Sequence, residues 1–209
     1  MNKTLIATAL CTLLAAPSLA LAAGNLVVNG SFEATAQGSG TWAVYNTVAG
    51  WTTVSGSGIE VRNNVAGSAF DGSNFVELDG HANTANTVMQ QTLLNTTAGQ
   101  LYDLGFAYSA RPGVANAASN GLAVAWNGTT LTTLAGKGAG QHNWLEVGLQ
   151  VVGTGHDVLS FRATGPNDGL GGSLDNVSLT AAVPEPGTYA LMVAGLLALG
   201  FIARRRPGA

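Results

Sequence analysis

The chain has 209 residues, of which 46% are hydrophobic and 9% are charged, whereas about 25% charged residues is usual for soluble domains. Between Gly24 and Val183, ten acidic residues outnumber four basic ones, and the net charge of this segment is −6. Binding to nucleic acid needs clustered lysine and arginine, so this charge argues against a nucleic-acid partner. The single cysteine, Cys11, lies in the N-terminal apolar run, which excludes disulfides and thiolate metal sites from the rest of the chain.

Residues 1–22 have the pattern of a secretory signal peptide. A positive start, an apolar middle and a small-residue cleavage site are supplied in turn by Lys3, residues 5–16 and Ala20-Leu21-Ala22. The alternative is an N-terminal membrane anchor, but the apolar run is shorter than the about 20 residues that a spanning helix needs. We therefore expect an N-terminal signal helix that is cleaved before Ala23 on export.

From Gly24 to about Thr180, apolar residues alternate with polar or small ones, as in strands with one buried face. The pattern predicts nine strands: Leu26–Val28, Ile59–Arg62, Phe75–Leu78, Val88–Leu93, Tyr102–Tyr108, Leu122–Trp126, Leu145–Val151, Val158–Ala163 and Leu174–Leu179. Asn-Gly pairs at positions 29–30 and 127–128 mark tight turns. No amphipathic helix of useful length occurs, so residues 23–182 are predicted to form an all-β sandwich or jelly roll.

The C-terminal segment, residues 183–206, has three features in a fixed order. Pro184, Glu185 and Pro186 come first, an uncharged stretch of 16 residues (188–203) follows, and Arg204, Arg205 and Arg206 come last. As a helix, the uncharged stretch would be about 24 Å long, which is shorter than the roughly 30 Å hydrocarbon core of a membrane. The positive-inside rule puts the arginines in the cytoplasm and the domain outside. The sequence thus predicts a short C-terminal transmembrane helix over 188–203.

This order of features resembles the PEP-CTERM sorting signal. The resemblance implies that exosortase, an integral-membrane transpeptidase-like enzyme, recognises Pro184-Glu185-Pro186 and removes the tail nearby. It also implies transient inner-membrane anchoring, with the domain in the periplasm, and a final place on the surface or in the matrix of a Gram-negative bacterium. The alternative is a plain single-pass anchor, for which the helix is short. Exosortase, the membrane before processing, and exopolysaccharide are the expected partners.

Several short motifs follow one another along the domain. They are Asn25-Leu26-Val27-Val28-Asn29-Gly30-Ser31-Phe32-Glu33, Gly50-Trp51, Phe75-Val76-Glu77-Leu78-Asp79-Gly80, Gln90-Gln91-Thr92-Leu93, residues 99–106 and Leu174-Asp175-Asn176-Val177. Their order is similar to that of the galactose-binding-like jelly rolls, a group that includes many carbohydrate-binding modules. The resemblance implies a jelly-roll β-sandwich for residues 23–182 and an association with carbohydrate.

In those jelly rolls, an acidic residue after the opening Phe and another in the last strand often join a structural Ca²⁺. The corresponding residues are Glu33 and Asp175, and Asn29 would add a side-chain or carbonyl oxygen. Calcium takes about six to eight oxygen ligands, so two carboxylates are few for its cage. The alternative is that both carboxylates bond to turn amides and hold the termini together. Both interpretations stay open, and one structural Ca²⁺ is the candidate cofactor.

Polar and aromatic side chains supply the candidate ligand contacts. Glu77, Asp79 and His81 alternate, so they share one strand face and could contact a sugar. The alternative is an ordinary solvated face that ends at the Asp79-Gly80 turn. Trp42 and Trp51 lie in loop-like surroundings, where an exposed ring could stack on the apolar face of a sugar. Trp51 could also fill the core.

Catalysis has little support in the sequence. The chain has no G-x-S-x-G elbow, H-E-x-x-H motif or phosphate loop. His156 and Asp157 are neighbours, which on a strand point to opposite faces. We therefore expect a non-catalytic exported protein that associates with polysaccharide. The alternatives are a purely structural matrix component without a ligand, and a glycan hydrolase that uses two of the acids as its carboxylate pair.

Overall fold

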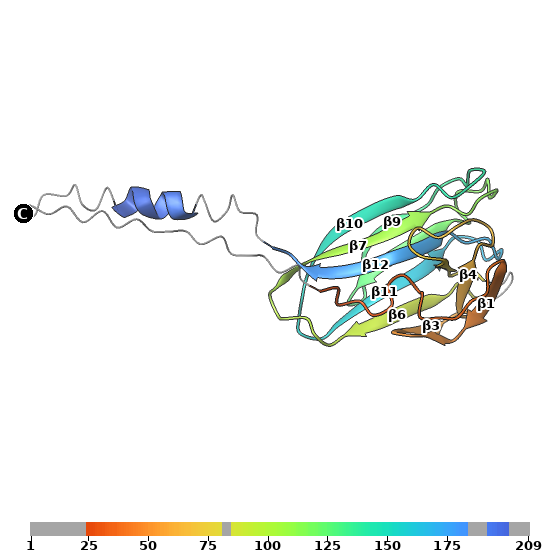
Figure 1. Cartoon of the computed structure of the whole chain (residues 1–209), viewed down its shortest axis with the longest axis horizontal. Helices are drawn as coiled ribbons and strands as arrows, with labels where there is room; N and C mark the ends of the chain where they lie inside the picture. Colours follow the sequence, from red (N-terminus) through yellow and green to blue (C-terminus); the bar gives the residue numbers. More distant parts are fainter. Residues whose placement is uncertain (1–23, 81–84, 184–191, 201–209) are drawn as a thin grey trace, which may run out of the picture.

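A computed structural model describes residues 24–80, 85–183 and 192–200, and its strands form two six-stranded antiparallel sheets (Figure 1). The first sheet, called the β7 sheet, has the order β1 (Thr41–Tyr45), β4 (Ile59–Asn63), β5 (Asn74–Glu77), β12 (Ser173–Ala181), β7 (Leu101–Ser109) and β10 (Leu145–Val152). The second, called the β11 sheet, has the order β2 (Thr47–Val48), β3 (Trp51–Ser55), β6 (Val88–Leu93), β11 (Asp157–Thr164), β8 (Gly121–Trp126) and β9 (Thr129–Leu134). The all-β prediction is confirmed.

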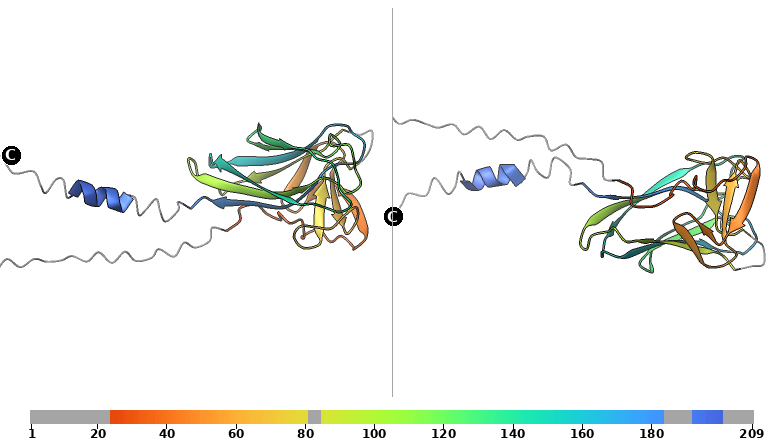
Figure 2. Two further views of the ribbon diagram at one scale, coloured as in Figure 1. Left: turned by 90° about the horizontal axis from the view of Figure 1, so that it is seen from above. Right: turned by 60° about the horizontal axis from the view of Figure 1, so that its bottom comes forward.

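The core lies between the two sheets, which Figure 2 shows from two further directions. Alternate residues of each strand point into it; those of β7 are Tyr102, Leu104, Phe106 and Tyr108, all of which are buried. Trp51 packs within it, with ring centroids 6.0 Å from Phe32 and 5.8 Å from Phe161. All members of this cluster fall between Val27 and Leu179. The described core cluster therefore lies wholly within residues 24–183, and we expect this segment to fold on its own.

Eight of the nine predicted strands are confirmed to within two residues, namely those that became β4, β5, β6, β7, β8, β10, β11 and β12. The prediction for Leu26–Val28 is wrong, because this segment is irregular. It still runs along β12: Leu26 N donates to Leu179 O and Val177 N donates to Gly30 O, each at 2.9 Å. A side chain at Gly30 would put its Cβ 1.9 Å from the Val177 oxygen, so this close approach requires glycine.

The Asn-Gly pair between β8 and β9 forms the predicted turn. Asn127 and Gly128 have φ of 50° and 79°, and two positive φ values are what a two-residue type I′ hairpin turn needs. Strands β1, β2, β3 and β9 were not predicted. β3 and β9 carry Thr on both faces, β1 is apolar at four successive positions (42–45), and β2 has only two residues. None of the four therefore shows an alternation of apolar and polar residues.

Loops cover one half of the outer face of the β7 sheet, and they leave the other half open. Glu60, Arg62 and Glu77 point away from the core, yet the loops bury all three. Near the end of β12, the outward side chains Asp103 and Gln150 remain exposed. The covered half holds a network of buried charges, and the open half holds a groove.

The two ends of the chain are only partly described. The predicted signal peptide, residues 1–22, lies outside the described residues, as do Pro184, Glu185, Pro186, Arg204, Arg205 and Arg206. Of the predicted transmembrane helix over 188–203, the structure describes 192–200, which are helical. Among the described residues, no helix reaches the length and apolarity needed to cross a membrane. The span therefore stays a prediction.

Candidate functional site

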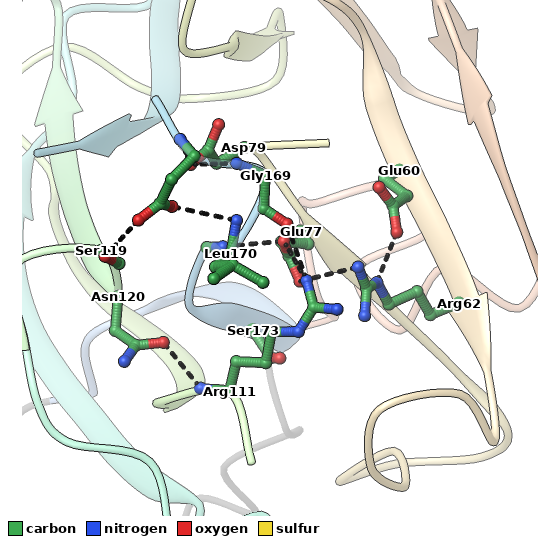
Figure 3. A network of polar contacts seen from close by, with 12 residues as sticks. Glu60, Arg62, Glu77, Asp79, Arg111, Ser119, Asn120, Gly169, Leu170 and Ser173 are labelled. Atoms are coloured by element: carbon green, nitrogen blue, oxygen red, sulfur yellow. Dashed lines mark hydrogen bonds and ion pairs between the residues drawn. The ribbon is translucent and has the colours of Figure 1, made fainter. Parts of the chain in front are cut away.

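A network of charged side chains is buried on the covered half of the β7 sheet (Figure 3). Arg62 Nη2 of β4 lies 3.1 Å from Glu77 Oε2 of β5, and Arg62 Nε contacts Glu60. Arg111, from the loop after β7, places Nη1 3.1 Å from Glu77 Oε1 and donates to Gly169 O at 2.9 Å. The network thus joins two strands to two loops that are distant in sequence.

Glu77 is the centre of this network and is fully buried, with 0% exposure. Burial raises the pKa of Glu77 to about 8, against the lowering effect of the Arg62 and Arg111 guanidinium groups. Its Oε1 also accepts a hydrogen bond from Gly171 N at 2.7 Å. A buried carboxylate with this many partners fixes the position of the loop, and it has no surface to offer to a ligand.

Asp79 has a similar role. It is 2% exposed, burial raises its pKa, and its Oδ2 accepts hydrogen bonds from Asp168 N and Gly169 N, each at 3.2 Å. The prediction that Glu77 and Asp79 contact a sugar is therefore wrong, because the loops over the sheet bury both side chains. The alternative of a solvated face is wrong for the same reason. His81 lies outside the described residues.

The two carboxylates predicted to hold calcium converge on one loop, residues 70–74. Glu33 Oε1 accepts hydrogen bonds from the amides of Ser73 and Asn74, at 2.8 and 2.6 Å. Asp175 Oδ2 accepts from the amides of Phe70 and Asp71, at 2.8 and 3.0 Å. These bonds match the interpretation in which the carboxylates hold turn amides.

The fit of this site to calcium is mixed. In favour, Asp175 is fully buried, burial raises its pKa to about 7, and none of its described hydrogen-bond partners is a cation. Against it, the described residues contain no cluster of three or more His, Cys, Asp or Glu side chains. Asn29 is used elsewhere: its Oδ1 accepts from Ala34 N and its Nδ2 donates to Ala49 O. Calcium would therefore need several backbone carbonyls or waters besides the two carboxylates.

The open half of the β7 sheet carries a groove that crosses β10, β7 and β12. It consists of two adjoining hollows of about 380 and 230 Å³, and we define it by Asp103, Gly105, Glu146, Gly148, Gln150, Asn176, Ser178 and Thr180. In the strand register, Gly105 lies opposite Gly148 on one side and Ser178 on the other. Three neighbouring positions thus carry nothing larger than a hydroxymethyl group, and this is the physical cause of the hollow.

The groove is lined by hydrogen-bonding groups and also by four apolar residues, Leu104, Phe106, Val147 and Leu149. Gln150 Nε2 donates to Asp103 Oδ1 at 3.0 Å, and Thr180 lies beside Asp103 in the register. Asn176 has a φ of 48° at the irregularity of β12 and is exposed at the groove. The lining of the groove offers amide, hydroxyl and carboxylate groups but no Lys, Arg or His. Such a surface favours a ligand rich in hydroxyl groups and disfavours an anion.

The tryptophans occupy three different environments. Trp51 is 1% exposed in the core, so its prediction as a ligand contact is wrong. Trp42 is 49% exposed on β1 and lies opposite Arg62, but three strand spacings, or about 14 Å, separate β1 from β12. Trp144 is partly exposed, two residues before Glu146, and donates from Nε1 to Ser68 O at 3.2 Å. Trp144 is therefore the tryptophan that lies nearest the groove in the chain.

The sequence analysis did not identify the groove, although it contained one signal. Gly105 and Gly148 interrupt two predicted strands, and a glycine inside a strand often marks a place where a ligand or another backbone comes close. What the local pattern cannot supply is the register that brings these two glycines together.

Comparison with known proteins identifies the tail. Residues 182–206 match the family described as the PEP-CTERM protein-sorting motif, which confirms the sorting signal predicted over 183–206. The protein is therefore exported and sorted through the cell envelope.

Two curated relatives match the domain. The multifunctional-autoprocessing repeats-in-toxin proteins of Vibrio vulnificus and of Vibrio cholerae serotype O1 are each 32% identical to this chain, over 158 and 166 residues. These matches take in 74% and 76% of this chain. The chain spans about 3% of the length of either relative.

Solved structures with TM-scores above 0.5 share the fold. The arabinose-bound MgGH51 α-L-arabinofuranosidase is 13% identical, with a TM-score of 0.52 over 76% of this chain and 26% of that one. The K1 cleaved adhesin domain of Lys-gingipain from Porphyromonas gingivalis W83 is 18% identical, with a TM-score of 0.51 over 68% of this chain and 98% of that one. CBM35 from Paenibacillus barcinonensis is 23% identical over 68% of this chain and 100% of that one, with a TM-score of 0.44. The protein is thus an exported jelly-roll sandwich that carries a PEP-CTERM motif.

Proposed function

We propose that this exported protein is a non-catalytic polysaccharide-binding protein, and that a neutral polysaccharide lies across the groove on β10, β7 and β12. The groove is the observation that carries the proposal. It is open, its floor is made of Gly105, Gly148 and Ser178, and polar side chains line it. The fold alone does not determine a ligand, so the argument rests on the chemistry of these residues.

The lining matches neutral sugars better than acidic ones. Asp103 and Glu146 accept hydrogen bonds from sugar hydroxyls, while Gln150, Ser178 and Thr180 can both donate and accept. Because the groove lining contains no cation, the two carboxylates would repel uronic acids and sulfated chains. Trp144 could add a stacking face at the end beyond Glu146.

The same geometry supports a binding role over hydrolysis. Asp103 lies opposite Gln150, which is four residues from Glu146 along β10. Four residues of strand span about 13 Å, whereas the carboxylate pairs of glycoside hydrolases are separated by about 5–9.5 Å. The proposed role is therefore adhesion to polysaccharide, and the alternative is a structural matrix component without a ligand.

The sorting motif supports the rest of the proposal. Exosortase would recognise Pro184-Glu185-Pro186 and remove the tail, while Arg204–Arg206 hold it in the cytoplasmic leaflet. The signal peptide, the inner membrane and the exopolysaccharide of a Gram-negative host complete the proposed route. The domain would end on the cell surface or in a biofilm matrix, associated with that polysaccharide.

A leucine on the groove floor tests the binding proposal. Gly148 has open space where a Cβ would lie, so Gly148→Leu should fill the groove while the sheet stays intact. We expect residues 24–183 to bind a neutral polysaccharide, measured by affinity electrophoresis, and Gly148→Leu to weaken the binding at least about tenfold, or 1.4 kcal/mol.

Gly140→Leu is the matched control, because Gly140 is exposed, away from the groove, and also has open space at its Cβ. This control should bind as the parent does. Equal retention of Gly148→Leu and its parent would show that the polysaccharide binds elsewhere, and no retention of the parent on any neutral polysaccharide would favour the purely structural alternative.

We also propose that one structural Ca²⁺ binds between Glu33 and Asp175. The burial of Asp175, whose described hydrogen-bond partners include no cation, supports it, as does the convergence of both carboxylates on residues 70–74. Calcium at about 100 times its dissociation constant should raise the melting temperature of residues 24–183 by about 5–10 °C.

In that experiment, Glu33→Gln should lose the rise, while Glu146→Gln, an exposed acid in the groove, should keep it. Differential scanning calorimetry in calcium and in EDTA measures the melting temperature with and without the ion. Identical melting temperatures of the parent in the two buffers would rule out the calcium site and leave the turn-amide interpretation.

A further inference from the structure

Figure 1 shows the end of the sandwich where β12 stops and the tail begins. This end carries exposed apolar side chains. They are Leu94, Leu101, Val152 and Val183, with exposed fractions of 65%, 39%, 53% and 55%, and we call them the tail-end patch. Leu101 and Val152 are cross-strand partners, and Ala182 N donates to Leu101 O at 2.9 Å, which brings Val183 beside them. A hollow of about 440 Å³ lies between Leu101, Gln150 and Val183.

The loops around this patch are uncharged. Residues 94–100, 127–128 and 152–155 contain no Asp, Glu, Lys or Arg. Asp157 follows closely, but it is fully buried and bonded to Thr96, Asn127 and Thr154. Apart from the buried Asp157, the charged residues that make up the net charge of −6 between residues 24 and 183 lie outside these loops.

The sorting motif follows directly after this end of the sandwich, and its position limits how far the end can lie from a membrane. The sorting motif begins at residue 182, and the uncharged stretch begins at 188, five residues after Val183. Five residues reach at most about 18 Å. As long as the tail lies in the membrane, the tail-end patch therefore stays within that distance of the lipid surface.

We propose that the tail-end patch docks on the headgroup region of the lipid bilayer until the tail is removed. The inference rests on the membrane-anchored, sorted route proposed above. Apolar side chains gain free energy when they leave water for this region, and an uncharged end avoids the repulsion that an acidic surface meets at anionic lipids. Docking fixes the height and orientation of the Pro-Glu-Pro segment at the membrane surface.

The patch is also suited to release. Stable membrane attachment takes two signals, and a few apolar side chains alone are too weak an anchor. Once the tail is cut, the tail-end patch is the only attachment left between the domain and the membrane, and the domain leaves the bilayer. The same patch thus allows the domain to bind the bilayer before cleavage and to leave it afterwards, without a conformational change.

Hydrogen–deuterium exchange tests the docking. The chain without its signal peptide, residues 23–209, is placed in vesicles of phosphatidylethanolamine and phosphatidylglycerol, and flotation first shows whether it is anchored. In the floated material, amides of residues 94–101 and 152–156 should exchange at least about fivefold more slowly than in residues 24–183 free in solution. Amides of β3, on the β11 sheet, should exchange equally in both samples.

Variants separate docking from simple anchoring. Leu101→Ser with Val152→Ser should abolish the slowing, and so should Leu94→Ser with Val183→Ser, a pair that leaves the strands untouched. Val54→Ser, which removes an equally exposed valine from β3, should leave the slowed exchange of residues 94–101 and 152–156 unchanged.

The outcomes distinguish the two proposals. Floated chain without slowed exchange overturns the docking and leaves the sorting route intact, whereas chain that does not float overturns both. Slowing that grows with protein density in the vesicles points to a second copy of the chain and also overturns the docking on lipid.

Discussion

Arg62→Ala should lower the free energy of unfolding by about 3–5 kcal/mol, since it removes one cation of a buried ion-pair network and leaves two buried acids with less opposite charge beside them. Arg62 is 4% exposed and joins Glu77, which is 0% exposed, to Glu60, which is 1% exposed. Urea denaturation of residues 24–183 measures the loss as a lower midpoint at an unchanged slope.

The control is Arg162→Ala, an exposed arginine on β11. It should change stability by no more than about 0.5 kcal/mol, as is usual for surface substitutions. A loss of that small size in Arg62→Ala itself would mean that the network is solvated and does not hold the loops over the β7 sheet.

Replacing Pro184, Glu185 and Pro186 together with alanines should leave the full-length chain in the membrane of its host. Prolines keep the backbone out of a helix just before the uncharged stretch, and three alanines would let the helix extend through the recognition element. Immunoblots of membrane and extracellular fractions should show a larger, membrane-bound form and almost no released domain.

Pro207→Ala is the control for this experiment, because Pro207 lies outside the matched motif, residues 182–206. It should be processed normally. Normal processing of the triple alanine variant would contradict recognition of the Pro-Glu-Pro element and would favour a different route to the surface.

The sheets could be predicted from sequence where one strand face is apolar and the other is not. Tyr102–Tyr108 and Leu145–Val151 were located in this way, because alternation is a local signal. Strands β1, β2, β3 and β9 gave no such signal: threonine occupies both faces of β3 and β9, β1 is apolar at four successive positions, and β2 has only two residues. The sorting motif was the easiest part, because its three features are contiguous in sequence.

The charge network could not be predicted, because its contacts are distant in sequence. Glu77 meets Arg111 across 34 residues and Gly171 across 94. From the alternation alone, Glu77 and Asp79 belong to a polar face, and nothing local reveals that loops cover that face. The same holds for Trp51, whose loop-like neighbours give no sign that its ring packs between Phe32 and Phe161.

The groove depends on register in the same way. Gly105, Gly148 and Ser178 are each unremarkable in their own segments, and only the pairing of β10 with β7 and of β7 with β12 lines them up. A glycine in a strand suggests a close approach. The partner of each glycine comes from the fold.

The most direct test of the central claim is a chemical-shift titration of labelled residues 24–183 with soluble fragments of a neutral exopolysaccharide. We expect saturable shifts at the amides of Gly105, Gly148 and Ser178, with the Glu77 network unaffected. Shifts confined to the loops over the β7 sheet, or to the β11 sheet, would contradict that claim.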